Sequence, residues 1–155
     1  MARSDFRFRH RMRVRYAEID AQKIVFNTRY LEYYDVGITE YFRETGLNAL
    51  EQPDGGDAEF HVAHNEIDYK KPLAWDEEFD VCLRCASIGR SSLRFEWEIH
   101  GLANGEEEDD LRALGKSVSV HVGELGGKPS PVPDGIVLVF ETFEEKELRT
   151  EKKAA

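Results

Sequence analysis

Two patterns, one of period 2 and one of helical period, constrain the fold of this chain most strongly. Between Leu93 and Ile99, apolar residues alternate with Arg and Glu, which is the pattern of a β-strand with one buried face. Between Leu31 and Phe42, apolar residues recur at spacings of three and four, which is the pattern of an amphipathic α-helix. A chain that contains both patterns buries its apolar surface by packing a helix on a sheet.

The same two patterns predict the remaining elements and their order. The long helix starts at Asn27 or Thr28, either of which can cap its amino end, and it stops at Gly46. Gly37, inside this helix, indicates a close approach to another backbone. We predict further strands over residues 6–16, 60–69, 79–87 and 114–122. We also predict a loop over residues 51–57 and a second, short helix over residues 134–149. This order predicts a two-layer α+β domain with a five-stranded antiparallel sheet.

The length and charge of the chain limit what it can be. Its 155 residues, without an internal repeat, predict a single domain over residues 1–155. The 21 basic and 31 acidic residues give a net charge of -10, which opposes binding to nucleic acid and to anionic membranes. No stretch approaches the roughly 18 apolar residues of a membrane span, and the amino end lacks the apolar centre of a signal peptide. We therefore expect a cytoplasmic protein.

The side chains that commonly bind metals do not form a metal-site pattern in this sequence. Cys82 and Cys85 form a C-x-x-C pair, but the period-2 strand around them sends their side chains to opposite faces of a sheet. We therefore expect two unlinked structural cysteines. His61 and His64 diverge on their strand for the same reason.

Four stretches of sequence together resemble one enzyme family. They are VRYAEIDAQKIVFNTRYLEYYD at residues 14–35, IDYKKPLAWDE at 67–77, GRSSLRF at 89–95 and GKPSPVP at 127–133. These stretches and their order are similar to those of hotdog-fold acyl-CoA thioesterases of the 4-hydroxybenzoyl-CoA thioesterase type, over residues 8–140. The resemblance implies a hotdog fold, in which an antiparallel five-stranded sheet wraps around one long central helix, followed by a short C-terminal helix. It also implies that the protein hydrolyses thioesters.

The resemblance further implies which residues form the active site. The active-site Asp of the family lies seven residues before the amino end of the central helix, and Asp20 has this position relative to Asn27. In relatives, a backbone N–H at the helix start polarises the thioester carbonyl, which implies this role for the N–H groups near Asn27 and Thr28. A helix amino end offers unpaired donors and a partial positive charge, which suit an oxyanion. Many relatives have Gly where this chain has Lys23.

Other interpretations of the carboxylates remain open. Without the resemblance, Asp20 is interpreted as a turn or capping residue. Glu18 and Asp35 are the competing carboxylates. Glu18 is two residues away and shares the face of Asp20 if the preceding strand continues, whereas Asp35 follows the aromatic face of the helix and is interpreted as polar surface or a subunit contact. We nevertheless expect the Glu18 side chain to be solvated.

Basic and serine residues are the candidates for binding the acyl-CoA substrate. Lys70, Lys71 and Arg90 are candidates for contacts with the phosphates of coenzyme A, and the resemblance implies that Ser91 and Ser92 lie near the acyl or pantetheine channel. Neither serine has the G-x-S-x-G context of a nucleophile.

We expect an enzyme without a metal or redox cofactor, assembled as a homodimer or as a homotetramer built from dimers. We expect assembly because both faces of the sheet carry apolar residues and one helix can cover only one face, so a second subunit has to cover the other. The alternatives are a thioesterase that acts on acyl carrier protein and a noncatalytic module that binds acyl thioesters.

Overall fold

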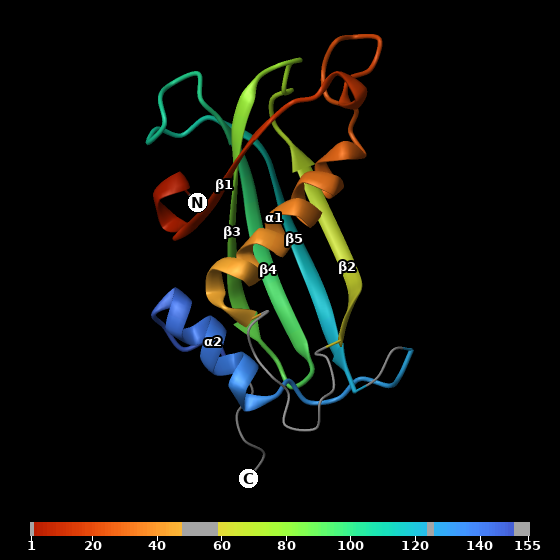
Figure 1. The fold of residues 1–155 in the computed structure, drawn as a ribbon, viewed down its shortest axis with the longest axis vertical. Helices are drawn as coiled ribbons and strands as arrows, with labels where there is room; N and C mark the ends of the chain where they lie inside the picture. The colour runs from red at the N-terminus through yellow and green to blue at the C-terminus, as the bar shows by residue number, and fades with distance from the viewer. Residues whose placement is uncertain (1, 48–58, 124–125, 151–155) are drawn as a thin grey trace. The chain divides into compact units, whose positions relative to one another are not determined.

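The structure of the protein is a computed structural model that describes residues 2–47, 59–123 and 126–150. The loop predicted over residues 51–57 lies outside these described residues. The elements follow one another in the order η1 (Arg3–Asp5), β1 (Phe8–Arg13), η2 (Tyr16–Glu18), α1 (Arg29–Thr45), β2 (Glu59–Tyr69), β3 (Glu78–Ile88), β4 (Ser92–Gly101), β5 (Leu111–Val122) and α2 (Asp134–Glu144). Here η denotes a 3₁₀-helix, and Figure 1 shows these elements along the chain.

The strands form one five-stranded antiparallel sheet with the order β1-β3-β4-β5-β2. Together with the long helix α1 and the short helix α2, this sheet confirms the predicted α+β class. β2 is an edge strand, and most of its residues are exposed. Neither α1 nor any other helix in the described part of the chain combines the length and apolarity that a membrane-spanning helix needs.

The described residues divide into two compact units. The first unit comprises residues 2–41, 67–84 and 97–115, and the second comprises residues 42–47, 59–66, 85–96, 116–123 and 126–150. The single domain over residues 1–155 stays a prediction.

In the first unit, α1 contacts β3 with its apolar face. Tyr30, Tyr33, Tyr34 and Tyr41 of α1 are buried, and the ring of Tyr33 lies 4.7 Å from the ring of Phe79 in β3. α1 lies close to β3 at Gly37, because a Cβ built on this residue would lie 2.7 Å from Cγ1 of Val81. The expected close approach is therefore present, but Gly37 meets a side chain of β3 rather than a backbone.

In the second unit, α2 packs through Phe140, whose ring lies 6.1 Å from that of Phe95 in β4. α2 ends at Glu144, earlier than the predicted residue 149. It ends there because Glu145 adopts the left-handed conformation, with φ of 56°, and its backbone N–H bonds to the carbonyl of Glu141.

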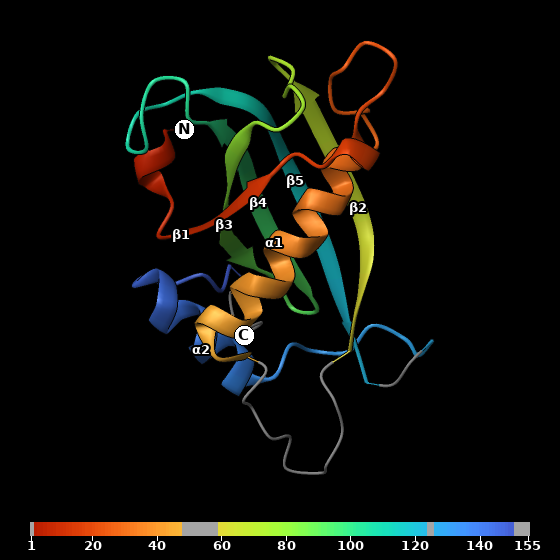
Figure 2. The ribbon, with the colours of Figure 1, turned by 45° about the horizontal axis from the view of Figure 1, so that its top comes forward.

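The strand predicted over residues 6–16 is shorter in the structure. β1 pairs with β3 from Phe8↔Leu83 to Arg13↔Glu78, and the chain then turns into η2. Figure 2 shows this segment leaving β1 and looping back before α1 begins. The strand ends because the Arg15 N–H donates to the Glu18 carboxylate at 2.7 Å instead of joining a ladder. Glu18 consequently does not lie on the face of a continuing strand.

Candidate active site

The candidate active site is built on a small hairpin between η2 and α1. The N–H of Phe26 donates to the carbonyl of Glu18 at 3.0 Å, and the N–H of Asp20 donates to the carbonyl of Ile24 at 2.9 Å. The hairpin rests on the segment before β3, where the N–H of Val25 donates to the carbonyl of Leu73 at 2.9 Å. α1 begins at once after the hairpin, so one short segment carries both Asp20 and the helix start.

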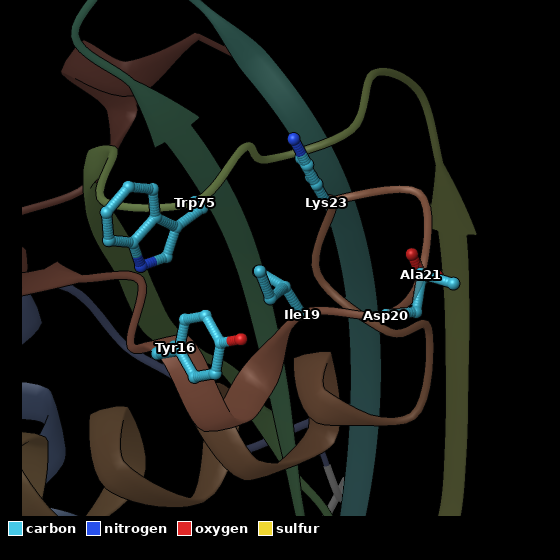
Figure 3. Close-up of a pocket in the computed structure, with 6 residues that line it drawn as sticks. All are labelled: Tyr16, Ile19, Asp20, Ala21, Lys23 and Trp75. Atoms are coloured by element: carbon cyan, nitrogen blue, oxygen red, sulfur yellow. The ribbon is translucent and has the colours of Figure 1, made fainter.

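Asp20 is half-buried and belongs both to a turn and to a cavity. Its Oδ1 accepts the N–H of Gln22 at 2.7 Å, which is the hydrogen bond of an Asx turn. The same residue lines a cavity of about 480 Å³, which Figure 3 shows with its lining residues Tyr16, Ile19, Asp20, Ala21, Lys23 and Trp75. The turn interpretation and the active-site interpretation are therefore compatible in geometry.

Two exposed aromatic residues form a wall of this cavity. Tyr16 and Trp75 have exposed fractions of 78% and 53%, and their rings meet edge to face with centroids 6.4 Å apart. Sequence reasoning did not single out either residue as part of a site. The one feature of the sequence that could have indicated this wall is Trp75, because it lies in a polar turn before β3 and not in a segment with a core pattern.

Lys23 occupies the position at which many relatives have Gly. Its backbone adopts the left-handed conformation with φ of 63°, which Gly adopts without steric cost. Lys23 therefore keeps the backbone conformation that Gly would adopt here, but with local strain. In Figure 3 the Lys23 side chain extends away from Asp20 along the edge of the cavity.

A second cavity, of about 340 Å³, is lined by Ile24 and Val25 of the hairpin and brings together three predicted site residues. Asn27, Lys70 and Lys71 line it. The carbonyl of Asn27 accepts the hydroxyl of Tyr69 at 2.9 Å, and Thr28 is exposed in the turn that leads into α1. Within the described residues, no acceptor bonds to the backbone N–H of Asn27 or of Thr28.

The basic turn at Lys70 and Lys71 is held by a buried ion-pair network. The N–H groups of both lysines donate to the carbonyl of Arg112, at 2.9 and 3.1 Å. The Arg112 guanidinium pairs with Asp110 at 2.8 Å and with Glu77. Its hydrogen bond to Asp110 lowers the pKa of that carboxyl from 3.8 to about 2. Because the Lys71 ammonium lies 3.7 Å from Asp110, its charge is partly compensated, whereas no such pair involves Lys70 among the described residues.

The other three predicted binding residues lie in the second unit, Arg90 and Ser91 in the turn between β3 and β4 and Ser92 at the start of β4. The carbonyl of Arg90 accepts the N–H of Val132 at 2.8 Å, and the carbonyl of Ser91 accepts the N–H of His121 at 2.7 Å. Ser92 closes the turn, because its carbonyl accepts the N–H of Gly89 at 2.8 Å. Of the predicted site residues in the first unit, the structure brings Asn27, Lys70 and Lys71 together at the second cavity, whereas Asp20 lines the first cavity.

Glu18 is not solvated, contrary to the expectation from sequence. Its exposed fraction is 3%, and its carboxylate accepts hydrogen bonds from the Tyr33 hydroxyl at 2.9 Å and from Arg15. The burial of Glu18 could not be predicted from the local sequence, because it depends on a tertiary hydrogen bond from Tyr33 on α1.

The cysteines are free and buried, as expected. Burial raises the pKa of the Cys82 thiol to about 12 and raises the pKa of the Cys85 thiol as well. Among the described residues, no group of three or more His, Cys, Asp or Glu side chains is arranged to hold a metal ion.

Comparison with known proteins identifies the family of this chain. Residues 14–140 match the sequence profile of the Thioesterase-like superfamily, and this range contains both cavities. The chain belongs to this superfamily. Its sheet and helices have the hotdog fold of thioesterases of known structure.

Three solved structures illustrate these similarities. A thioesterase from Thermus thermophilus, complexed with coenzyme A and Zn, is 31% identical, with a TM-score of 0.73 over 92% of this chain and 98% of that chain. A hypothetical protein from Aquifex aeolicus is 28% identical, with a TM-score of 0.72 over 86% of this chain and 98% of that chain. A 1,4-dihydroxy-2-naphthoyl-CoA thioesterase from Synechocystis shares the fold at 16% identity, with a TM-score of 0.71 over 86% of this chain and 94% of that chain.

Proposed function

We propose that the protein is an acyl-CoA thioesterase of the 4-hydroxybenzoyl-CoA type, which hydrolyses a thioester to a carboxylic acid and coenzyme A. The observation that carries this proposal is that one hairpin holds Asp20 at a cavity and continues directly into the amino end of α1. Membership of the Thioesterase-like superfamily and the coenzyme A in the Thermus thermophilus relative support the class of reaction.

The roles follow from the chemistry of thioester hydrolysis. The Asp20 carboxylate attacks the thioester carbonyl or accepts a proton from the attacking water. The negative charge that develops on the carbonyl oxygen is stabilised by N–H donors, and the unpaired N–H groups of Asn27 and Thr28 at the start of α1 are suited to it. If Asp20 attacks, it displaces the thiolate of coenzyme A and forms a mixed anhydride, which water hydrolyses to release the carboxylic acid and restore the Asp20 carboxylate. If Asp20 is the base, the water that it deprotonates displaces the thiolate directly and gives the carboxylic acid.

The competing carboxylate is poorly suited to this role. Both oxygens of Glu18 accept hydrogen bonds, and its side chain is almost completely buried. A buried carboxylate with satisfied oxygens cannot reach a substrate without breaking those bonds. Asp20 lines a cavity, and only its Oδ1 accepts a hydrogen bond of the turn, so Asp20 can reach a substrate in its present conformation.

Coenzyme A binding completes the proposal. Lys70 and Lys71 line the cavity beside the helix start, where their ammonium groups are candidates for the coenzyme A phosphates. Arg90, Ser91 and Ser92 stay candidates for contacts with the phosphates and the pantetheine arm. We further propose a cytoplasmic homo-oligomer that needs no metal or redox cofactor, for which the exposed edge strand β2 offers a surface for a second copy.

The test is thiol release from a panel of aliphatic and aromatic acyl-CoA substrates, followed with a thiol-trapping dye. An acyl carrier protein thioester is included as a separate arm. We expect turnover of at least one acyl-CoA and a lower kcat/KM on the carrier thioester, because the net charge of -10 repels an acidic carrier. If the folded protein released thiol from none of these thioesters, the proposed function would be wrong. A preference for the carrier thioester would reassign the substrate.

A further inference from the structure

The most completely buried acid near the proposed site is Glu18, which the proposed chemistry does not use. Its Oε1 accepts the Arg15 N–H at 2.7 Å and the Tyr33 hydroxyl at 2.9 Å, and its Oε2 accepts Arg15 Nε at 3.1 Å. The Arg15 side chain is 75% exposed, whereas that of Glu18 is 4% exposed. The neutral partner Tyr33 therefore lies on the buried side of the carboxylate, and the charged partner lies on the solvent side.

These contacts connect the two halves of the proposed site. Glu18 lies at the base of the hairpin, where its carbonyl accepts the N–H of Phe26, and Asp20 follows two residues later. Tyr33 lies on α1, whose amino end carries the proposed oxyanion donors. The bond between Glu18 and Tyr33 therefore ties the hairpin that carries Asp20 to the helix that carries the N–H groups.

Tyr33 is a rigid anchor for this bond. Its exposed fraction is 1%, and its ring packs against Tyr30 with centroids 5.9 Å apart and against Phe79 with centroids 4.7 Å apart. Burial and the hydrogen bond to Glu18 raise the pKa of the Tyr33 phenol, so it stays protonated and donates its hydrogen to the carboxylate.

We propose that Glu18 and Tyr33 are positioning residues that hold Asp20 in register with the amino end of α1 for attack on the thioester carbonyl. This inference rests on the proposed function. Reactions between positioned groups are sensitive to displacements of about 1 Å, which can cost about 10²-fold in rate. Loss of the bond should therefore lower kcat, while KM, which depends on contacts with the remainder of the substrate, should stay unchanged.

The test compares Tyr33→Phe with Tyr41→Phe as a matched control. Both residues are buried tyrosines on α1, and Tyr41 packs edge to face on Phe8, away from the hairpin. We expect Tyr33→Phe to lower kcat by roughly 10- to 100-fold at unchanged KM, and Tyr41→Phe to keep the parent kcat. If the two variants had equal kcat values, or if Tyr33→Phe raised KM alone, the inference would be overturned.

A second variant and a second background separate positioning from simple destabilisation. Glu18→Gln keeps the acceptor Oε1 for Tyr33 and for the Arg15 N–H, so its kcat should stay closer to the parent than that of Tyr33→Phe. In single-turnover reactions with excess enzyme, Tyr33→Phe should have no further effect once Asp20 is replaced by Asn, because it acts through Asp20. Losses that multiply would overturn the inference and leave the proposed function intact. A parent protein without thioesterase activity would overturn the proposed function itself.

Discussion

The contact between Gly37 in α1 and Val81 in β3 makes the effect of one substitution depend on its background. A Cβ at Gly37 would lie 2.7 Å from Val81 Cγ1, closer than real Cβ atoms approach other heavy atoms. Replacing Gly by Ala inside a helix gains about 1 kcal/mol of helix propensity, whereas overpacking a filled core costs typically about 1–3 kcal/mol. Val81 has an exposed fraction of 0%, so the added methyl group has no free space. We expect Gly37→Ala to lower the free energy of unfolding by about 1 kcal/mol.

Removing the obstruction should reverse the sign of this effect. In Val81→Ala the nearest remaining atom is the Cβ of residue 81, at 3.5 Å, which is an ordinary van der Waals distance. Gly37→Ala should then raise the free energy of unfolding by up to about 1 kcal/mol through helix propensity alone. Urea unfolding of the parent, the two single variants and the double variant measures this cycle, at one protein concentration. The comparison requires that the free energy of unfolding falls with urea concentration at the same slope in all four proteins. An effect of Gly37→Ala with the same sign and size in both backgrounds would refute the reasoning.

Three further predictions concern single groups. Lys23→Gly should raise the free energy of unfolding by about 0.5–1 kcal/mol, because it relieves the left-handed conformation of a residue with a side chain; a loss of stability on urea unfolding would contradict this. Because the pKa of Asp110 is about 2 in the folded protein and 3.8 ordinarily, its pairing with Arg112 stabilises the fold above about pH 4. This contribution, about 2 kcal/mol, should disappear between pH 4 and pH 2, and Asp110→Asn should remove that part of the pH dependence from acid-unfolding curves. Because burial raises the pKa of the Cys82 thiol to about 12, this thiol should react with iodoacetamide at pH 8 roughly 10³-fold more slowly in the folded than in the unfolded protein. Equal rates in the two states would contradict this burial.

The elements that could be predicted from sequence are those in which burial of one face imposes a period. The alternation from Leu93 to Ile99 fixes the interior of β4, and the helical spacing after Arg29 fixes α1, because each pattern repeats the geometry of its element. Their ends were less predictable. Residues 12, 14 and 16 continue the alternation of β1, so no local signal stops the strand before η2. It stops because of the hydrogen bond between Arg15 and Glu18, which a period cannot reveal.

The site was predictable only in part, for a related reason. The resemblance of the hairpin sequence and its spacing to the helix indicate Asp20, and Lys23 has a positive φ, which Gly adopts without steric cost. The burial of Glu18 depends on Tyr33, fifteen residues later, and the aromatic wall joins Tyr16 to Trp75 from a distant turn. Contacts of this kind exist only after the chain folds.

The substitution Asp20→Asn tests the central claim most directly. Asn keeps the size of the side chain and the oxygen that accepts the Gln22 N–H, so the Asx turn survives, but it removes the charge and the basicity. The matched control is Asp35→Asn, which alters an exposed carboxylate on α1.

The measurement is kcat/KM on the best acyl-CoA substrate, with thermal melting and oligomer mass recorded for each variant. A catalytic role predicts that Asp20→Asn lowers kcat/KM by roughly 10²–10⁴-fold, or about 3–5 kcal/mol at 1.36 kcal/mol per factor of ten, while Asp35→Asn leaves it unchanged. An Asp20→Asn protein that folds, assembles and hydrolyses the substrate at the parent rate would contradict the account and make Asp20 a turn residue alone.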